Sequence, residues 1–226
     1  MPNKYERFVG AYLRLNGYFQ VPSFIVHAAD PTRTSGGVVG NYTECDSLAI
    51  RLPHSEEIVG VKHVANHQAL LDGAGGKIDV IVAEAKSGNE NRPNTVWRAA
   101  ATADPIASYI VRFVGTHPAP EVGAVAATLA STFRSEDTTT RYRYIVFSIQ
   151  ANKHYADRGI TYITYREAIR FVVAVRGDSW LQSGLGVRSA HNQWDDMLID
   201  IFRIANDQAR DIEQRIADIE SFLAAP

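Results

Sequence analysis

A short run of the sequence places a carboxylate and an ammonium group at the end of an apolar strand face. In DVIVAEAK, residues 79–86, side chains alternate between the two faces of a strand, so Glu84 and Lys86 share the face of the apolar residues. Asp79 points to the other face. Charged groups beside a core are costly unless they serve each other or a ligand. The spacing therefore predicts a functional pair.

A second run, ECDSLAI at residues 44–50, repeats this arrangement upstream. Here Glu44 and Asp46 share one face with Leu48 and Ile50. If the two strands are neighbours, their acids converge on one point. Glu44 has two interpretations, a second acid of the site or a solvated residue at the start of the strand.

This residue set suits hydrolysis of a phosphodiester. A hard cation neutralises charge on the phosphoryl oxygens and lowers the pKa of an attacking water, and Mg²⁺ needs only one or two carboxylates. Asp46 and Glu84 are sufficient for that, with Mg²⁺ or Mn²⁺ as the expected cofactor. Lys86 is placed to orient the water and to offset developing negative charge, and the backbone carbonyl of Ala85 is a further candidate ligand.

The elements that must position these residues follow from periodicity and from the glycine and proline positions. The expected helices and strands, in chain order, are helix 4–16, strands 19–29, 44–52 and 78–85, helices 95–115 and 121–133, strands 142–150 and 159–164, and helix 165–175. Residues 53–77 form an irregular insertion or a short helix between loops. This order predicts an α/β fold with a mixed central sheet flanked by helices.

The C-terminal segment predicts a long amphipathic helix over residues 191–223, whose later part, DQARDIEQRIADIESFL, has a short coiled-coil pattern. This pattern fits a helix that covers the chain's own core, and it fits equally a helix that pairs two copies as a homodimer. We expect one domain over 1–190 and a helical extension over 191–226.

Composition sets limits on partners and compartment. The 226-residue chain has a formal net charge of −2, so a phosphate-binding surface must be local. The candidates for contact with nucleic acid are Arg92, Arg98, Arg141 and Arg143. The sequence has one cysteine, no apolar run long enough to span a membrane and no apolar signal region, so we expect a cytoplasmic protein without a membrane partner.

The segments GYFQVPSFIV, ECDSLAIR and VIVAEAKSG, preceded by a helix with an early glutamate, together resemble the core of the PD-(D/E)XK, or restriction-endonuclease-like, nuclease superfamily. The resemblance covers roughly residues 4–150. It implies a helix, three strands, a helix and a strand, with metal binding and water activation by Asp46, Glu84 and Lys86. The glutamate often found on the first helix of that family matches Glu6.

Two positions depart from the family pattern. Cys45 stands where the proline of the motif precedes the aspartate. Gln150 resembles a glutamine that some branches carry after the last core strand, but His154 stands where their spacing requires tyrosine.

The resemblance implies a metal-dependent nuclease, an endonuclease that hydrolyses DNA, with a role in restriction, repair or phage defence. One alternative is a catalytically inactive member that keeps the fold as a nucleic-acid-binding or assembly module. Another is an unrelated metal-dependent hydrolase of a small phosphorylated molecule, which the near-neutral charge permits.

Overall fold

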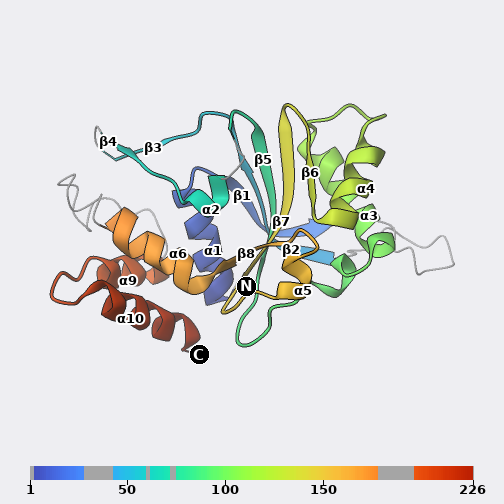
Figure 1. The fold of residues 1–226 in the computed structure, drawn as a ribbon. Coiled ribbons are helices and arrows are strands. Elements are labelled where there is room, and N and C mark those ends of the chain that lie inside the picture. The colour runs from blue at the N-terminus through green and yellow to red at the C-terminus, as the bar shows by residue number, and fades with distance from the viewer. Residues whose placement is uncertain (1–2, 28–42, 60–61, 72–74, 178–195, 226) are drawn as a thin grey trace.

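Runs of β-branched and aromatic residues build one open mixed sheet of six strands flanked by helices (Figure 1). The computed structural model describes residues 3–27, 43–59, 62–71, 75–177 and 196–225. The strands of the sheet are β1 Phe19–Val26, β2 Thr43–Arg51, β5 Ile78–Ala85, β6 Arg134–Glu136, β7 Thr140–Ser148 and β8 Thr161–Thr164. Their order is β1-β2-β5-β7, and β6 and β8 pair with successive parts of β7.

Helices and two short strands complete the described chain. They are α1 Lys4–Leu15, β3 Glu57–Val59, β4 Lys62–Val64, α2 Gln68–Leu71, the 3-10 turn η1 Thr95–Trp97, α3 Ala100–Val114, α4 Val122–Thr132, α5 Lys153–Ala156, α6 Tyr165–Phe171, the π-helical turn η2 Val172–Gly177, α9 Asp196–Ala205 and α10 Ile212–Ala224. Within the insertion 53–77, β3 and β4 form a hairpin. No helix in the described ranges is both long and apolar enough to cross a membrane.

The register of the sheet brings four strand ends to one edge. β2 runs antiparallel to β5, and their last pair is Ser47 with Ala83. β5 and β7 are parallel and pair Ala85 with Phe147, and β8 continues in the same direction beside β7. The beginning of β2 therefore lies beside the ends of β5, β7 and β8.

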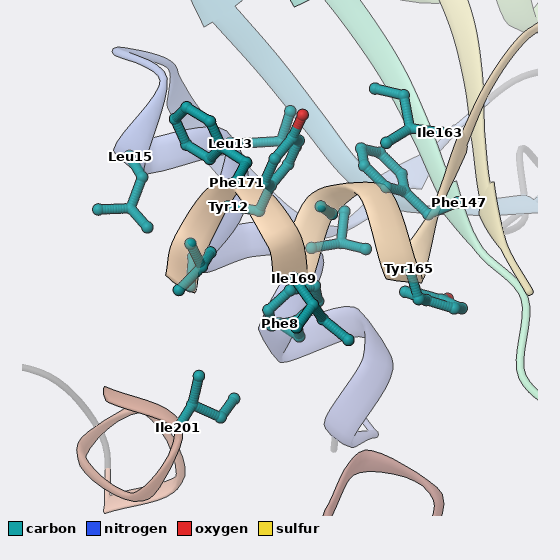
Figure 2. Close-up of a cluster of buried hydrophobic side chains, with 14 of the residues drawn as sticks. Phe8, Tyr12, Leu13, Leu15, Phe147, Ile163, Tyr165, Ile169, Phe171 and Ile201 are labelled. Atoms are coloured by element: carbon teal, nitrogen blue, oxygen red, sulfur yellow. The ribbon is translucent and has the colours of Figure 1, made fainter. Parts of the chain in front are cut away.

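One face of the sheet is covered by α1, α6, α9 and α10 (Figure 1). Phe8, Tyr12 and Leu13 of α1 are buried here against Phe147 of β7 and Ile169 of α6 (Figure 2). The ring of Tyr12 packs edge-on against Phe147, with 5.6 Å between ring centroids. Burial of these large side chains fixes α1, which carries Glu6, over the sheet.

The other face is covered by α3 and α4. Val80 and Val82 of β5 pack there with Trp97, whose side chain is buried against Tyr144 at 4.7 Å between ring centroids. Because the two faces bury different residues of β5, the face occupied by each side chain of this strand is fixed.

The expected α/β class, with its mixed sheet flanked by helices, is confirmed. The order helix, strand, strand, strand, helix, strand is present up to the end of β7, with the β3–β4 hairpin, α2, α4 and β6 as additions. The strand over residues 78–85 has the predicted bounds.

The prediction of one long C-terminal helix is wrong, because the described part of that segment forms two helices, α9 and α10. Asp211 ends the intervening turn as an N-cap that accepts a 2.8 Å hydrogen bond from the amide of Gln214. Arg215 of α10 donates to the carbonyl of Ala205 at 2.6 Å and so satisfies the end of α9. Residues 191–195 lie outside the described ranges.

The apolar residues of α9 and α10 are used within the chain. Ile201, Ile216, Ile219 and Leu223 are buried in the same cluster as α1 and α6. The side of the segment that resembled a coiled-coil seam therefore covers the chain's own core.

Candidate active site

Glu84 and Lys86 form an ion pair at the end of β5, on the α3 side of the sheet. Glu84 is 7% exposed. Its Oε1 pairs with Lys86, and its Oε2 accepts a 3.1 Å hydrogen bond from the amide of Asn94. Asp79, as expected from strand alternation, faces the opposite side of the sheet. Glu84 and Lys86 therefore lie on one face of β5, as strand alternation predicts.

Asp46 reaches the same sheet edge from β2. Its Oδ2 accepts a 2.7 Å hydrogen bond from the amide of Ala85, the residue between Glu84 and Lys86. The strand ladder between β2 and β5 ends at Ser47, so this side chain takes the place of the next backbone partner. The Asp46 carboxylate is thus fixed to the backbone of the strand that carries the other two residues.

The regular alternation of β2 changes at Asp46. Leu48 and Cys45 both pack on the α3 side, although strict alternation would put them on opposite faces. Opposite Asp46 in the register, Ser23 of β1 has a φ of 48°, in the left-handed region, and the ladder is interrupted at that pair. This local distortion is why the prediction that Glu44, Asp46, Leu48 and Ile50 share one face holds only in part.

Glu6 approaches Asp46 from α1. Glu6 completes a capping box with Asn3: the amide of Asn3 donates to Oε2 at 3.2 Å, and the side-chain oxygen of Asn3 accepts from the amide of Glu6 at 3.0 Å. Glu6 and Asp46 line the same pocket of ≈ 180 Å³. The structure therefore brings the predicted first-helix glutamate to the predicted site.

Burial raises the pKa of all three carboxyl groups. For Glu6 the neighbouring charge of Asp46 raises it further. For Asp46 the bond from Ala85 and the charge of Lys86 oppose the effect of burial, and the charge of Glu44 adds to it. For Glu84 the ammonium of Lys86 opposes burial without cancelling it. Negative charge at this edge is thus incompletely compensated.

Asp46 and Glu84 are the side chains of this set that could hold a divalent cation. Within the described ranges, no three or more histidine, cysteine or carboxylate side chains are arranged as a ready metal-binding group. Mg²⁺ needs fewer, because waters and substrate oxygens complete its shell. The buried Glu84 and the half-buried Asp46, both of raised pKa, are hard oxygen donors whose charge a cation would offset.

The remaining candidates for the ion differ in their placement. Glu44 is exposed, and its charge acts on Glu6 and Asp46. Ala85 contacts the site through its amide, which donates to Asp46. Binding of the ion by the Ala85 carbonyl therefore stays a prediction.

Arg141 and Arg143 are not part of an accessible basic surface, which corrects that expectation. Their exposed fractions are 0% and 4%, and both bind Asp79. The Nε of Arg141 lies 2.8 Å from Oδ1 of Asp79, and Arg143 also donates to the carbonyl of Leu70 at 2.8 Å. The strand begins at Thr140 instead of 142, so both guanidiniums enter the buried face of β7.

Arg92, Arg98 and Gln150 lie near the same edge of the sheet. Arg92 is exposed in the loop after β5, and Arg98 is half-buried and donates to the carbonyl of Pro93 at 2.9 Å. Gln150 is exposed two residues beyond the end of β7. The structure places these three residues around the site but does not link them to its acids.

Tyr165 is a residue that the sequence did not indicate. It begins α6 directly after β8, at the site's edge of the sheet (Figure 2), and its ring contacts Tyr5 at 4.6 Å between centroids. Its buried hydroxyl lies beside the amide of Lys86, but that amide donates to the carbonyl of Phe147 at 2.8 Å, so among the described residues the hydroxyl has no well-aligned partner. Burial, followed by Tyr5 and then the charge of Asp46, raises the pKa of this phenol. The sequence feature that could have located Tyr165 is the spacing of Thr164 and Glu167, because these two residues form a capping box that fixes the start of α6.

Comparison with family models, with curated proteins and with solved structures finds no match.

Proposed function

We propose that this protein is a divalent-metal-dependent nuclease that hydrolyses DNA phosphodiester bonds at Asp46, Glu84 and Lys86. The observation that supports the proposal is the meeting of the buried Glu84, the half-buried Asp46 and Lys86 at the adjoining ends of β2 and β5. Burial raises the pKa of both Asp46 and Glu84, and carboxyl groups of perturbed pKa that gather at one place favour a functional site over an exposed ion pair.

Each residue has a distinct role in this proposal. Asp46 and Glu84 hold Mg²⁺ or Mn²⁺, and the bond from Ala85 orients Asp46 for that task. The cation supplies Lewis acidity toward the phosphoryl oxygens and lowers the pKa of water. Lys86 orients the attacking water and offsets negative charge that develops on the phosphate. Glu6, at the Asp46 side of the pocket, supports the metal site.

The proposed fold family is that of restriction-endonuclease-like nucleases. The order of α1, β1, β2, β5, α3 and β7 supports it, with the site at the ends of the strands that the family uses. A role in restriction, repair or phage defence is part of the same proposal. A catalytically inactive module with the same fold is the alternative, and loss of metal binding would favour it.

The test compares cleavage of labelled DNA and RNA by purified protein with Mg²⁺, Mn²⁺ or EDTA. We expect metal-dependent cleavage of DNA and a loss of at least about 100-fold in Glu84→Gln and Lys86→Met. The matched controls are Glu90→Gln and Lys153→Met, which change exposed residues of the same types outside the site. Equal cleavage by all variants, or none by the native protein with any metal, would overturn the proposal.

A further inference from the structure

We infer that a groove along α1 binds one unpaired nucleic-acid strand and leads it to Asp46. This inference rests on the proposed function, since it assigns the path of the substrate at that same site. The groove also offers cationic side chains for contact with nucleic acid, a role that the buried Arg141 and Arg143 do not fill.

Two adjoining pockets make up the groove. The first, of ≈ 180 Å³, contains Glu6 and Asp46, and the second, of ≈ 560 Å³, extends to Tyr18 and Phe19. They share Arg14, Gln20 and Pro22 in their walls, so they are continuous. One end of the groove therefore contains Asp46 of the proposed metal site together with Glu6, and the other lies at the beginning of β1.

Two arginines of α1 lie along this path. Arg7 lines the pocket of the acids, and Arg14 lines both pockets. Seven residues of helix make nearly two turns and about 10 Å, so the two side chains leave α1 on one side. At a rise of about 3.4 Å per nucleotide, that distance spans roughly three nucleotides. The two guanidiniums are thus spaced to meet separate phosphates of one strand.

The floor between them carries small and polar groups. Ser47 donates to Oε1 of Gln20 at 3.2 Å, which leaves the amide nitrogen of Gln20 as a donor for a phosphate oxygen. A Cβ on Gly10 would lie 2.9 Å from the Gln20 amide, so glycine is what lets this side chain lie against α1. The floor can therefore accept a phosphate backbone at close range.

The far end of the groove presents an aromatic ring. Phe19, at the beginning of β1, is 69% exposed. Arginines that follow a backbone together with an exposed ring are the combination that binds single strands, because each unpaired base has a face that stacks on an aromatic side chain. In a duplex the bases are already stacked, so this ring favours an unpaired strand.

The test measures binding of a labelled single-stranded oligonucleotide, and of its duplex, by fluorescence anisotropy in EDTA over a range of salt concentrations. The variants are Arg7→Gln, Arg14→Gln and Phe19→Leu. Arg112→Gln and Phe113→Leu are matched controls, since both residues are exposed on α3 at the opposite face of the sheet. Melting temperatures verify that every variant is folded.

We expect the native protein to prefer the single strand. Each arginine variant should bind it at least fivefold more weakly, with a salt dependence whose slope is smaller by about 0.7. Phe19→Leu should also bind at least fivefold more weakly, but with an unchanged slope, because stacking releases no counterion. The controls should stay within twofold of the native protein.

Groove variants that bind as well as the controls, or a native protein that binds the duplex at least as tightly, overturn the inference. Because no metal is present, this result is separate from cleavage. If the native protein binds the single strand as expected but cleaves nothing with any metal, the inference about the groove is supported and the proposed function is wrong. If cleavage depends on Glu84 but the groove variants bind the single strand as well as the native protein, the proposed function stands and the inference about the groove is wrong.

Discussion

The Asp46 carboxylate accepts a hydrogen bond of 2.7 Å from the amide of Ala85, the residue that separates Glu84 from Lys86. This bond joins two strands at the point where their backbone ladder ends. It sets the position of the β2 acid relative to the acid and the lysine of β5. The geometry of the site thus depends on a side chain that also completes the sheet.

The two functions of Asp46 can be separated by substitution. Asp46→Asn keeps an acceptor for the Ala85 amide and removes the charge, whereas Asp46→Ala removes both. At pH 7.5 we expect Asp46→Asn to be as stable as the native protein or more stable, by on the order of 1 kcal/mol. Asp46→Ala should lose about 1–3 kcal/mol, because it leaves a buried amide without a partner. Urea denaturation measures both.

The pH dependence of that difference follows from the raised pKa of Asp46. The folded state binds this proton more tightly than the unfolded state, so ionisation costs stability as pH rises from the ordinary aspartate value through the raised one. The advantage of Asp46→Asn should therefore be full above this window and should vanish below about pH 4. An advantage that grows as the pH falls would contradict the assignment.

Metal binding should stabilise the folded protein. At a Mn²⁺ concentration about 100 times the dissociation constant, the free energy of unfolding should increase by about 2.7 kcal/mol. Protons compete for carboxyl groups whose pKa is raised, so the effect should weaken as the pH falls. Thermal melts with and without Mn²⁺ measure it. Asp46→Asn and Glu84→Gln should lose the shift, whereas Glu90→Gln should keep it.

Removal of the hydroxyl of Tyr165, on α6, and of Tyr12, on α1, should change the stability of the protein in opposite directions. Tyr165→Phe removes a buried hydroxyl that has no well-aligned partner among the described residues, so stability should rise by about 1 kcal/mol. Tyr12→Phe removes a hydroxyl that is hydrogen-bonded to Nδ1 of His67, so stability should fall by a similar amount. Urea denaturation of both variants is the measurement. A loss of stability in Tyr165→Phe would show that its hydroxyl has a structural partner.

Asp79 should be among the most sensitive residues of the fold. Asp79→Ala leaves the guanidiniums of Arg141 and Arg143 buried without their carboxylate, which should cost about 3–5 kcal/mol. The hydrogen bonds and charges of these arginines lower the pKa of Asp79 despite its burial. Its contribution is therefore present above the ordinary aspartate pKa and is lost as the pH falls through the native value. Asp157→Ala, at an exposed ion pair, should change stability by less than about 1 kcal/mol.

Strand alternation was the sequence feature that predicted the site most directly. A period of two assigns Glu84 and Lys86 to one face of β5 and Asp79 to the other, and neither statement depends on distant residues. The burial of Arg141 and Arg143 does depend on a distant residue, because their partner Asp79 lies 62 and 64 residues away in the sequence. Local charge patterns cannot distinguish such a buried cluster from a solvated surface.

Other features required the tertiary structure. The change of face at Asp46 depends on Ser23 in the neighbouring strand, and the groove depends on α1 lying over β1 and β2. The break between α9 and α10 was readable in part, since Asp211 followed by Gln214 has capping-box spacing. The apolar periodicity continues through the turn, and that is why it predicted one helix.

The most direct test of the metal site is a crystal of the native protein soaked in Mn²⁺ and measured for anomalous scattering. We expect a peak about 2.0–2.3 Å from carboxylate oxygens of both Asp46 and Glu84, beside the amine of Lys86. Crystals of Asp46→Asn should lose that peak. A saturating soak that leaves this position empty, or that places Mn²⁺ only at other carboxylates, would contradict the central claim.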